Sequence, residues 1–146
     1  MRLFVVVFLV CVVTVGSFGQ EPRPVCPRHI DVPAYPLIAR AAHVAGKIEL
    51  LVMVDTEGRV EKAQPVNANL SSLPADRPYP QLFESPAIEN IRRWTFEPRS
   101  EPFSFRIVYD YGFDCSGPSS DTAVTKVTID FPKLVTIRTN CLPLNP

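Results

Sequence analysis

The chain has 146 residues, with 15 basic and 15 acidic side chains and therefore no formal net charge. A chain of this length holds one modest domain with extensions, and its charge balance provides no net field that would attract nucleic acid or an anionic membrane surface. The sequence also contains no serine nucleophile elbow, phosphate loop or pair of catalytic carboxylates. We therefore predict a protein that is not an enzyme, with no cofactor, no small-molecule substrate and no nucleic-acid partner.

The first 19 residues have the features of an export signal. A single basic residue, Arg2, precedes the apolar stretch 3–13, and small residues follow up to Gly19. We expect residues 1–19 to be a signal peptide, cleaved after Gly19, and the protein to reach the periplasm. The alternative is an uncleaved anchor in the inner membrane, with the rest of the chain facing the periplasm. It is disfavoured because a membrane-spanning helix needs about 20 apolar residues and this run ends near Val15.

The cysteines predict a disulfide. Of the four, Cys11 would leave with the signal peptide, so three remain in an oxidising compartment: Cys26, Cys115 and Cys141. A bridge from Cys115 to Cys141, which would tie down the C-terminal tail, is the favoured pairing, and Cys26 to Cys115 is the second option. The spacings are too wide for a zinc site and the chain has only two histidines, so no metal site is predicted.

Residues 20–34 form a proline-rich leader. We expect an extended chain there, without a folded element, because proline fixes φ and removes a backbone donor. A short helix should follow, since Pro36 is tolerated in a first helical turn and good helix formers stand behind it. This helix is expected to end before Gly46.

A β-hairpin is predicted next. Apolar residues alternate with more polar ones over 47–55, which indicates a strand with one buried face: Ile48, Leu50, Val52 and Val54. Asp55 begins a tight turn in which Gly58 can take positive φ, and Val60 resumes an extended pattern.

The returning strand, expected to reach about position 67, is less regular. Val60 and Ala63 differ in parity and Pro65 cannot donate to a ladder, which predicts a bulge or an early edge. A proline-rich loop over 69–82 should connect this strand to the next helix.

A second helix is predicted from Ser85, an N-cap residue, with Pro86 at the first helical position. Apolar residues at 87, 88, 91 and 94 fall on one stripe, so the helix is expected to end near Trp94. After Pro98 the chain alternates cleanly, and one face of the resulting strand carries six large apolar residues: Phe103, Phe105, Ile107, Tyr109, Tyr111 and Phe113.

Residues 115–146 form a C-terminal extension. A small polar run over 116–121 precedes apolar residues at 127, 129 and 131, then Pro132, then apolar residues at 135 and 137. This pattern fits a further hairpin or one broken strand. The predicted fold class is α+β: a small antiparallel sheet of about three strands with two helices, in the order helix, strand, strand, helix, strand, plus this C-terminal β extension.

Several short motifs occur in a fixed order over 35–114. They are Tyr35-Pro36, Gly46 at a strand start, Asp55, Gly58 and Val60 in the hairpin, and Trp94, Phe96 and Pro98 at the helix exit. Together they resemble the C-terminal domain family of the TonB energy transducers. The physical roles of these residues are structural: Gly58 allows a left-handed turn residue, while Trp94 and Phe96 add large apolar area to a small core.

The resemblance implies a binding mode. In the family this domain pairs its last strand with an extended segment of a partner, which is β-augmentation at a sheet edge. Here it implies a partner-binding edge along 103–113 and further contacts from the leader residues Asp31, Val32, Pro33 and Ala34. The implied partner is a protein or peptide, with an outer-membrane transporter or a second copy of the chain as candidates. Whether the tail, over 124–137, covers that edge is left open by the sequence.

Overall fold

The computed structural model describes residues 24–70, 81–117, 122 and 124–142. The predicted signal peptide and its cleavage after Gly19 lie outside the described residues, as does most of the loop predicted over 69–82. Within the described part of the chain, no helix has the length and apolar character needed to cross a membrane.

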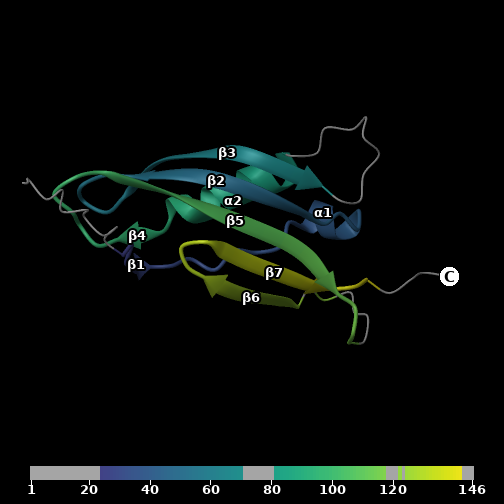
Figure 1. Cartoon of the computed structure of the whole chain (residues 1–146). Helices are drawn as coiled ribbons and strands as arrows, with labels where there is room; N and C mark the ends of the chain where they lie inside the picture. Colours follow the sequence, from purple (N-terminus) through teal and green to yellow (C-terminus); the bar gives the residue numbers. More distant parts are fainter. Residues whose placement is uncertain (1–23, 71–80, 118–121, 123, 143–146) are drawn as a thin grey trace, which may run out of the picture.

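A five-stranded sheet organises the fold, in the spatial order β3-β2-β5-β7-β6 (Figure 1). Neighbouring strands are antiparallel except β5 and β7, which run parallel. Two helices, α1 and α2, lie against one face of the sheet. The elements are α1 Leu37–Ala41, β2 Gly46–Val54, β3 Val60–Leu70, α2 Gln81–Arg92, β5 Phe103–Asp114, β6 Thr125–Asp130 and β7 Leu134–Asn140.

A second, two-stranded sheet involves the leader. Its strands are β1, Pro27–His29, and β4, Thr95–Phe96, which pair antiparallel. The expectation that the leader contains no folded element is therefore wrong for β1. The α+β class is confirmed, but the sheets contain more strands than the three predicted, because both the leader and the tail supply strands that pair with the central domain.

The short helix α1 ends in a Schellman motif. The N–H of Val44 donates to the carbonyl of Ala39 at 2.9 Å, and the N–H of His43 donates to the carbonyl of Arg40 at 3.1 Å. His43 occupies the left-handed position, with φ of 53°. Its ring stacks on Phe113, with ring centroids 5.5 Å apart. The helix therefore ends before Gly46, as predicted.

The helix α2 begins earlier than predicted. It starts at Gln81, so Pro86 lies inside the helix and not at its first position. An internal proline removes one helical hydrogen bond. The extra turn brings Phe83 into the core, where it is fully buried and packs against Tyr35 and Tyr111. Burial of a phenylalanine stabilises by about 2–3 kcal/mol, which offsets much of the cost of the proline.

The hairpin between β2 and β3 forms as predicted. Gly58 has φ of +84°, and a Cβ atom at this position would lie 2.0 Å from the carbonyl oxygen of Phe96. The glycine is thus required both for the turn and for the close approach of β4, whose Phe96 N–H donates to the Gly58 carbonyl at 2.8 Å. The register of β3 shifts at two places, between Glu49 and Leu50 and between Met53 and Val54 of its partner strand, which confirms the predicted bulge.

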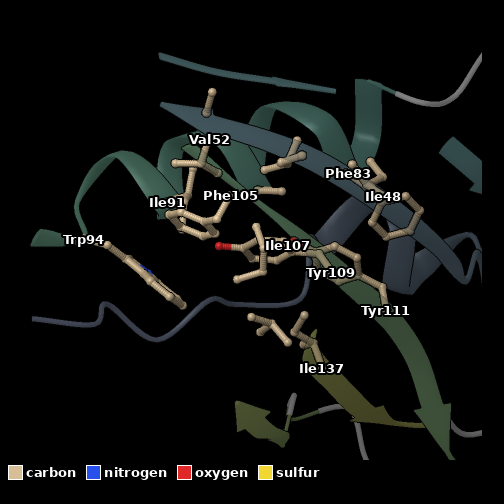
Figure 2. Close-up of a cluster of buried hydrophobic side chains, with 14 of the residues drawn as sticks. Ile48, Val52, Phe83, Ile91, Trp94, Phe105, Ile107, Tyr109, Tyr111 and Ile137 are labelled. Atoms are coloured by element: carbon tan, nitrogen blue, oxygen red, sulfur yellow. The ribbon is translucent and has the colours of Figure 1, made fainter. Parts of the chain in front are cut away.

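The core lies between the helices and the sheet, and it includes the tail (Figure 2). The alternating face predicted for β5 is buried or half-buried along its whole length. The tail forms a hairpin, β6 and β7, which is one of the two predicted arrangements, and the favoured bridge is confirmed, because Cys115 and Cys141 are disulfide-bonded. Cys26 is free and exposed.

Candidate functional site

The strand β5 has a neighbour on both sides along only part of its length. β2 pairs with it over 103–111, and β7 pairs with it over 108–114. The question that the sequence left open is thus answered in part: the tail covers the edge along the second half of the strand, which holds Tyr109, Tyr111 and Phe113. The first half, with Phe103, Phe105 and Ile107, has no strand partner on the side away from β2 among the described residues.

Burial explains why β7 occupies this position. The side chains of Val135 and Ile137 have no exposed surface, and Ile137 packs beside the β5 tyrosines (Figure 2). Each such side chain contributes roughly 1.5–3 kcal/mol when it leaves water. The tail is thus part of the core and not a flap on its surface.

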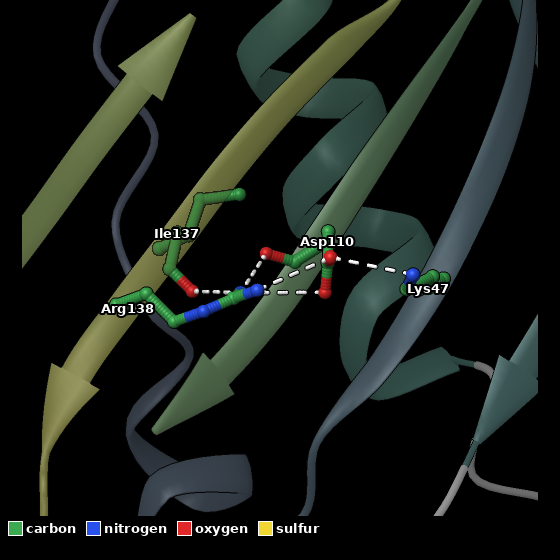
Figure 3. A network of polar contacts seen from close by, with 4 residues as sticks. All are labelled: Lys47, Asp110, Ile137 and Arg138. Atoms are coloured by element: carbon green, nitrogen blue, oxygen red, sulfur yellow. Dashed lines mark hydrogen bonds and ion pairs between the residues drawn. The ribbon is translucent and has the colours of Figure 1, made fainter. Parts of the chain in front are cut away.

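A polar network on the opposite face of the sheet joins three strands (Figure 3). Arg138 of β7 donates from Nη1 to the backbone carbonyl of Asp110 at 2.8 Å and pairs with the Asp110 carboxylate through Nη2 at 3.2 Å. Lys47 of β2 lies 3.5 Å from the same carboxylate. The Arg138 guanidinium passes directly over Gly112, where a Cβ atom would lie 2.9 Å from Nη1. A side chain at 112 would therefore push against the residue that anchors β7.

A second network anchors the end of β7. Asn140 accepts hydrogen bonds through Oδ1 from the N–H of Val124 at 2.9 Å and from Arg40 at 3.2 Å, and it donates to the carbonyl of Thr122 at 3.2 Å. Arg40 is nearly buried and belongs to α1. Together with the disulfide next to Asn140, these contacts attach the hairpin of β6 and β7 to the helical side of the domain.

The open half of β5 offers unused backbone groups. The N–H of Val108 donates to the carbonyl of Lys133 at 2.9 Å, so even-numbered residues of β5 direct their N–H and C=O groups away from β2. A second hydrogen bond agrees with this assignment. At the hairpin the N–H of Asp55 donates to the carbonyl of Arg59, so the backbone groups of odd-numbered β2 residues point toward β3. Those of even-numbered β2 residues then point toward the odd-numbered residues of β5 with which they pair. Ser104 and Arg106 therefore present their backbone groups on the side where no strand pairs.

Aromatic side chains lie beside this half-strand. The rings of Phe96, Phe105 and Phe131 form a cluster with centroids 5.4–5.9 Å apart, and Phe131 also packs on Trp94. Phe103 joins the cluster through Phe96, and Arg99 lies 4.3 Å above its ring. Phe103 and Phe131 are only half-buried. An added strand along Ser104 and Arg106 would thus meet apolar surface on the core side.

The four leader residues predicted to touch a partner differ in how far the fold leaves them exposed. The carbonyl of Asp31 accepts from Asn90 at 2.9 Å and from the Trp94 indole at 3.0 Å, and its carboxylate pairs with Arg93 at 2.6 Å. Pro33 is buried, whereas Ala34 is exposed and Val32 is 66% exposed. Asp31 therefore holds the leader on α2 and the residues that follow it, Pro33 is buried, and Val32 and Ala34 face solvent.

The family motif residues have structural roles, in the core or in the hairpin turn. Tyr35 is buried and donates from its hydroxyl to the carbonyl of Val44 at 2.6 Å, and burial raises the pKa of this phenol. Trp94 and Phe96 are fully buried. Asp55 closes the hairpin turn by accepting from the N–H groups of Glu57 and Arg59, each at 2.9 Å. The hydrogen bond from Arg59 is the main cause that lowers the pKa of Asp55.

The described residues contain no group of three or more metal-binding side chains. The most perturbed titratable groups are tyrosines of the core. Burial raises the pKa of Tyr109, whose hydroxyl donates to Asn90 at 2.8 Å, and of Tyr111. A phenol held neutral in this way supports packing and hydrogen bonding, and it supplies no base.

Four polar residues that organise the site were missed by the sequence reasoning: Arg40, Asp110, Arg138 and Asn140. None of the four belongs to the motifs or apolar faces from which the sequence predictions were made. A charged residue on a strand face usually indicates solvent exposure, and only the pairing of β5 with β7 brings Asp110 and Arg138 together.

The fold and site define a small α+β domain with a partly open strand edge. No family model matches the chain. A stretch of 73 residues is 29% identical to the protein TonB of Pseudomonas aeruginosa, strain PAO1, and it covers 50% of this chain and 19% of that protein. The chain therefore matches about a fifth of the length of that relative.

A solved structure is also similar to the chain. It is the solution NMR structure of the TonB C-terminal domain of Pseudomonas aeruginosa, with 20% sequence identity and a TM-score of 0.45, covering 68% of this chain and 94% of that one. The sequence comparison confirms the resemblance found in the motifs: half of the chain is similar to the protein TonB.

Proposed function

We propose that this chain is a non-enzymatic, TonB-like interaction module of the periplasm, which captures an extended segment of a partner protein by β-augmentation. The observation that carries the proposal is the open half of β5, where the backbones of Ser104 and Arg106 face away from β2 and have no strand partner among the described residues. Such an edge takes up an extended peptide through main-chain hydrogen bonds, and side-chain pockets add specificity.

The aromatic cluster beside the open half favours a partner with an apolar residue at alternate positions. Its half-buried rings, Phe103 and Phe131, would be covered by the side chains that an added strand directs toward the core. Val32 and Ala34 of the leader remain candidates for a second contact, because both are exposed. The TonB resemblance suggests an outer-membrane transporter as the partner and transport across the outer membrane as the process.

A proline substitution tests the edge without breaking the sheet. Arg106→Pro removes an N–H that points away from β2, so the ladder with β2 is retained, whereas Arg106→Ala keeps the N–H and removes the same side chain. A photo-reactive residue placed at Ser104 should form a crosslink to an outer-membrane protein in the source cells. We expect the proline variant to lose about tenfold in crosslink yield and the alanine variant to retain it. Equal yields from two correctly folded variants would contradict the proposal.

The location of the protein has its own measurement. The intact mass of the native protein shows whether the chain begins at Gln20, as export with a cleaved signal peptide requires. A chain that keeps residues 1–19 in the membrane fraction would instead support the alternative, a membrane-anchored transducer of the TonB type.

A further inference from the structure

The two outer strands of the sheet differ in how well they could accept another strand. β3 forms one edge, and its register shifts at two bulges while Pro65 lies within the strand. Bulges and proline are common devices that protect an edge from pairing. β6 forms the other edge, and its register with β7 is continuous over 125–130. Only β6 is thus a regular edge along its whole length.

The direction of the free backbone groups of β6 follows from two hydrogen bonds that agree. The N–H of Asn140 donates to the carbonyl of Val124 at 3.2 Å, so even-numbered residues at this end of the β6 pairing face β7. The N–H of Val108 donates to the carbonyl of Lys133, which shows that the backbone groups of odd-numbered residues of β7 point toward β5. The backbone groups of its even-numbered residues therefore point toward β6. Thr125, Val127 and Ile129 therefore direct their N–H and C=O groups outward.

The side chains of β6 are arranged in two rows. Val127 and Ile129 are half-buried and pack against the core, while Lys126, Thr128 and Asp130 are exposed on the other face. The exposed row carries a positive charge at one end and a negative charge at the other, with a threonine between them. This row is self-complementary when a second copy runs antiparallel to it.

We propose that two copies of the protein associate by antiparallel pairing of their β6 strands, with Thr128 facing Thr128 of the partner subunit. In this register Lys126 stands opposite Asp130 of the partner subunit, and Val127 stands opposite Ile129 of the partner subunit. The twofold symmetry repeats both pairs, which makes the interface isologous. The two sheets become one continuous sheet across the axis.

The charges select this register among the neighbouring ones. Centring the axis on Lys126 would place two like charges directly opposite, which is destabilising in a sheet. Centring it on Val127 would leave Lys126 opposite Thr128 of the partner subunit. The proposed register alone pairs both charges directly, while Val127 donates to and accepts from Ile129 of the partner subunit. The surface is separate from the open half of β5, so the dimer does not depend on the proposed function.

Charge exchange tests the pairing, with sedimentation velocity of the full exported protein as the measurement. We expect a concentration-dependent dimer that Asp130→Lys weakens about tenfold or more, because Lys126 then meets a lysine. Asp130→Lys is the cleaner single variant, because Lys126 also interacts with Asp114 of its own chain: hydrogen bonds from Ser116 are the main cause that lowers the pKa of Asp114, and the charge of Lys126 adds to them. Mixing the Lys126→Asp and Asp130→Lys proteins should restore association as a heterodimer. A protein that is monomeric at all concentrations, or a dimer that ignores these changes, would overturn the proposal.

A disulfide trap gives the register. Residues directly opposite in a non-hydrogen-bonded antiparallel pair have Cα atoms about 4.5 Å apart, within the range for a disulfide. In a Cys26→Ser background, Thr128→Cys should crosslink two chains on mild oxidation. Lys62→Cys, an exposed position on the β3 edge, is the matched control and should stay monomeric. Equal crosslinking at both positions would count against pairing through β6.

Discussion

The two halves of β5 have the same alternating sequence pattern and opposite situations at their edges. Over 108–114 the strand is closed by β7, by the Arg138 and Asp110 pair and by the nearby disulfide. Over 103–107 the same strand keeps its free backbone groups and borders half-buried aromatic rings. The closed half shows how a chain can cover its own strand edge, and the open half keeps the backbone groups that the proposed partner would use.

Removing a buried methyl-rich side chain from β7 should have the largest effect on the closed half. Ile137→Ala should lower the free energy of unfolding by about 3–4 kcal/mol, because Ile137 is fully buried and its truncation leaves a cavity. Ile129→Ala in the same hairpin, at a half-buried position, should cost about 1 kcal/mol. Urea unfolding of both variants measures the difference. If the two variants lost similar amounts of unfolding free energy, Ile137 would not be packed in the core.

Removing the disulfide should have the next largest effect. Cys115 and Cys141 are separated by 26 positions, and a disulfide that closes a loop typically contributes about 2–4 kcal/mol. The variant with serine at both positions should lose that amount in chemical unfolding, whereas Cys26→Ser should leave stability unchanged because Cys26 is free and exposed. If reduction of the wild-type protein had no effect on its unfolding midpoint, the bridge would not stabilise the closed half.

Proline substitutions compare the two halves directly. Val108→Pro removes the N–H that donates to Lys133 and leaves a carbonyl at the β7 side without its donor, so we expect a loss of about 2 kcal/mol. Ser104→Pro removes an N–H of the same orientation where no strand pairs, and it should cost less than about 1 kcal/mol. Thermal unfolding followed by circular dichroism separates the two outcomes. An equal loss would mean that the first half of β5 is not an open edge.

Ion pairs on the exposed sheet face should give the smallest effects. Asp110→Asn weakens contacts with both Arg138 and Lys47 and should cost about 1 kcal/mol, because the carboxylate is only 16% exposed. Glu49→Gln removes the ion pair with Arg106, whose two charged groups lie 3.3 Å apart beside the open half. This pair is more exposed, so its loss should lower the free energy of unfolding by only about 0.3 kcal/mol. Stability curves at low and high salt measure both. A larger loss for Glu49→Gln would reverse the comparison.

The sequence was a good guide where a structure depends on neighbouring residues. The β2–β3 hairpin followed from alternation and from Gly58, and the tail hairpin from two apolar runs around Pro132. The start of α2 was placed too late, because the rule that favours proline at a first helical position gave way to the burial of Phe83. A local preference of this size yields to tertiary packing.

The leader was misjudged for a related reason. Its prolines indicated an extended chain, and it is extended, but Asp31 binds three residues of α2 and its exit, and β1 pairs with β4. The partners of Asp31 lie about sixty positions further along the chain, where no local pattern could point to them. Binding by the leader therefore stays a prediction for Val32 and Ala34.

The sequence by itself determined which face of β5 is buried and where the β2–β3 hairpin turns, whereas the choice between two cysteine pairings was settled by the structure. Only the tertiary structure decided which strand lies beside β5, and therefore where an edge remains free. The physical reason is geometric. Alternation of apolar and polar residues reports the two faces of a strand, which lie above and below the sheet. The backbone groups that define an edge lie in the plane of the sheet, and side-chain pattern carries no information about them.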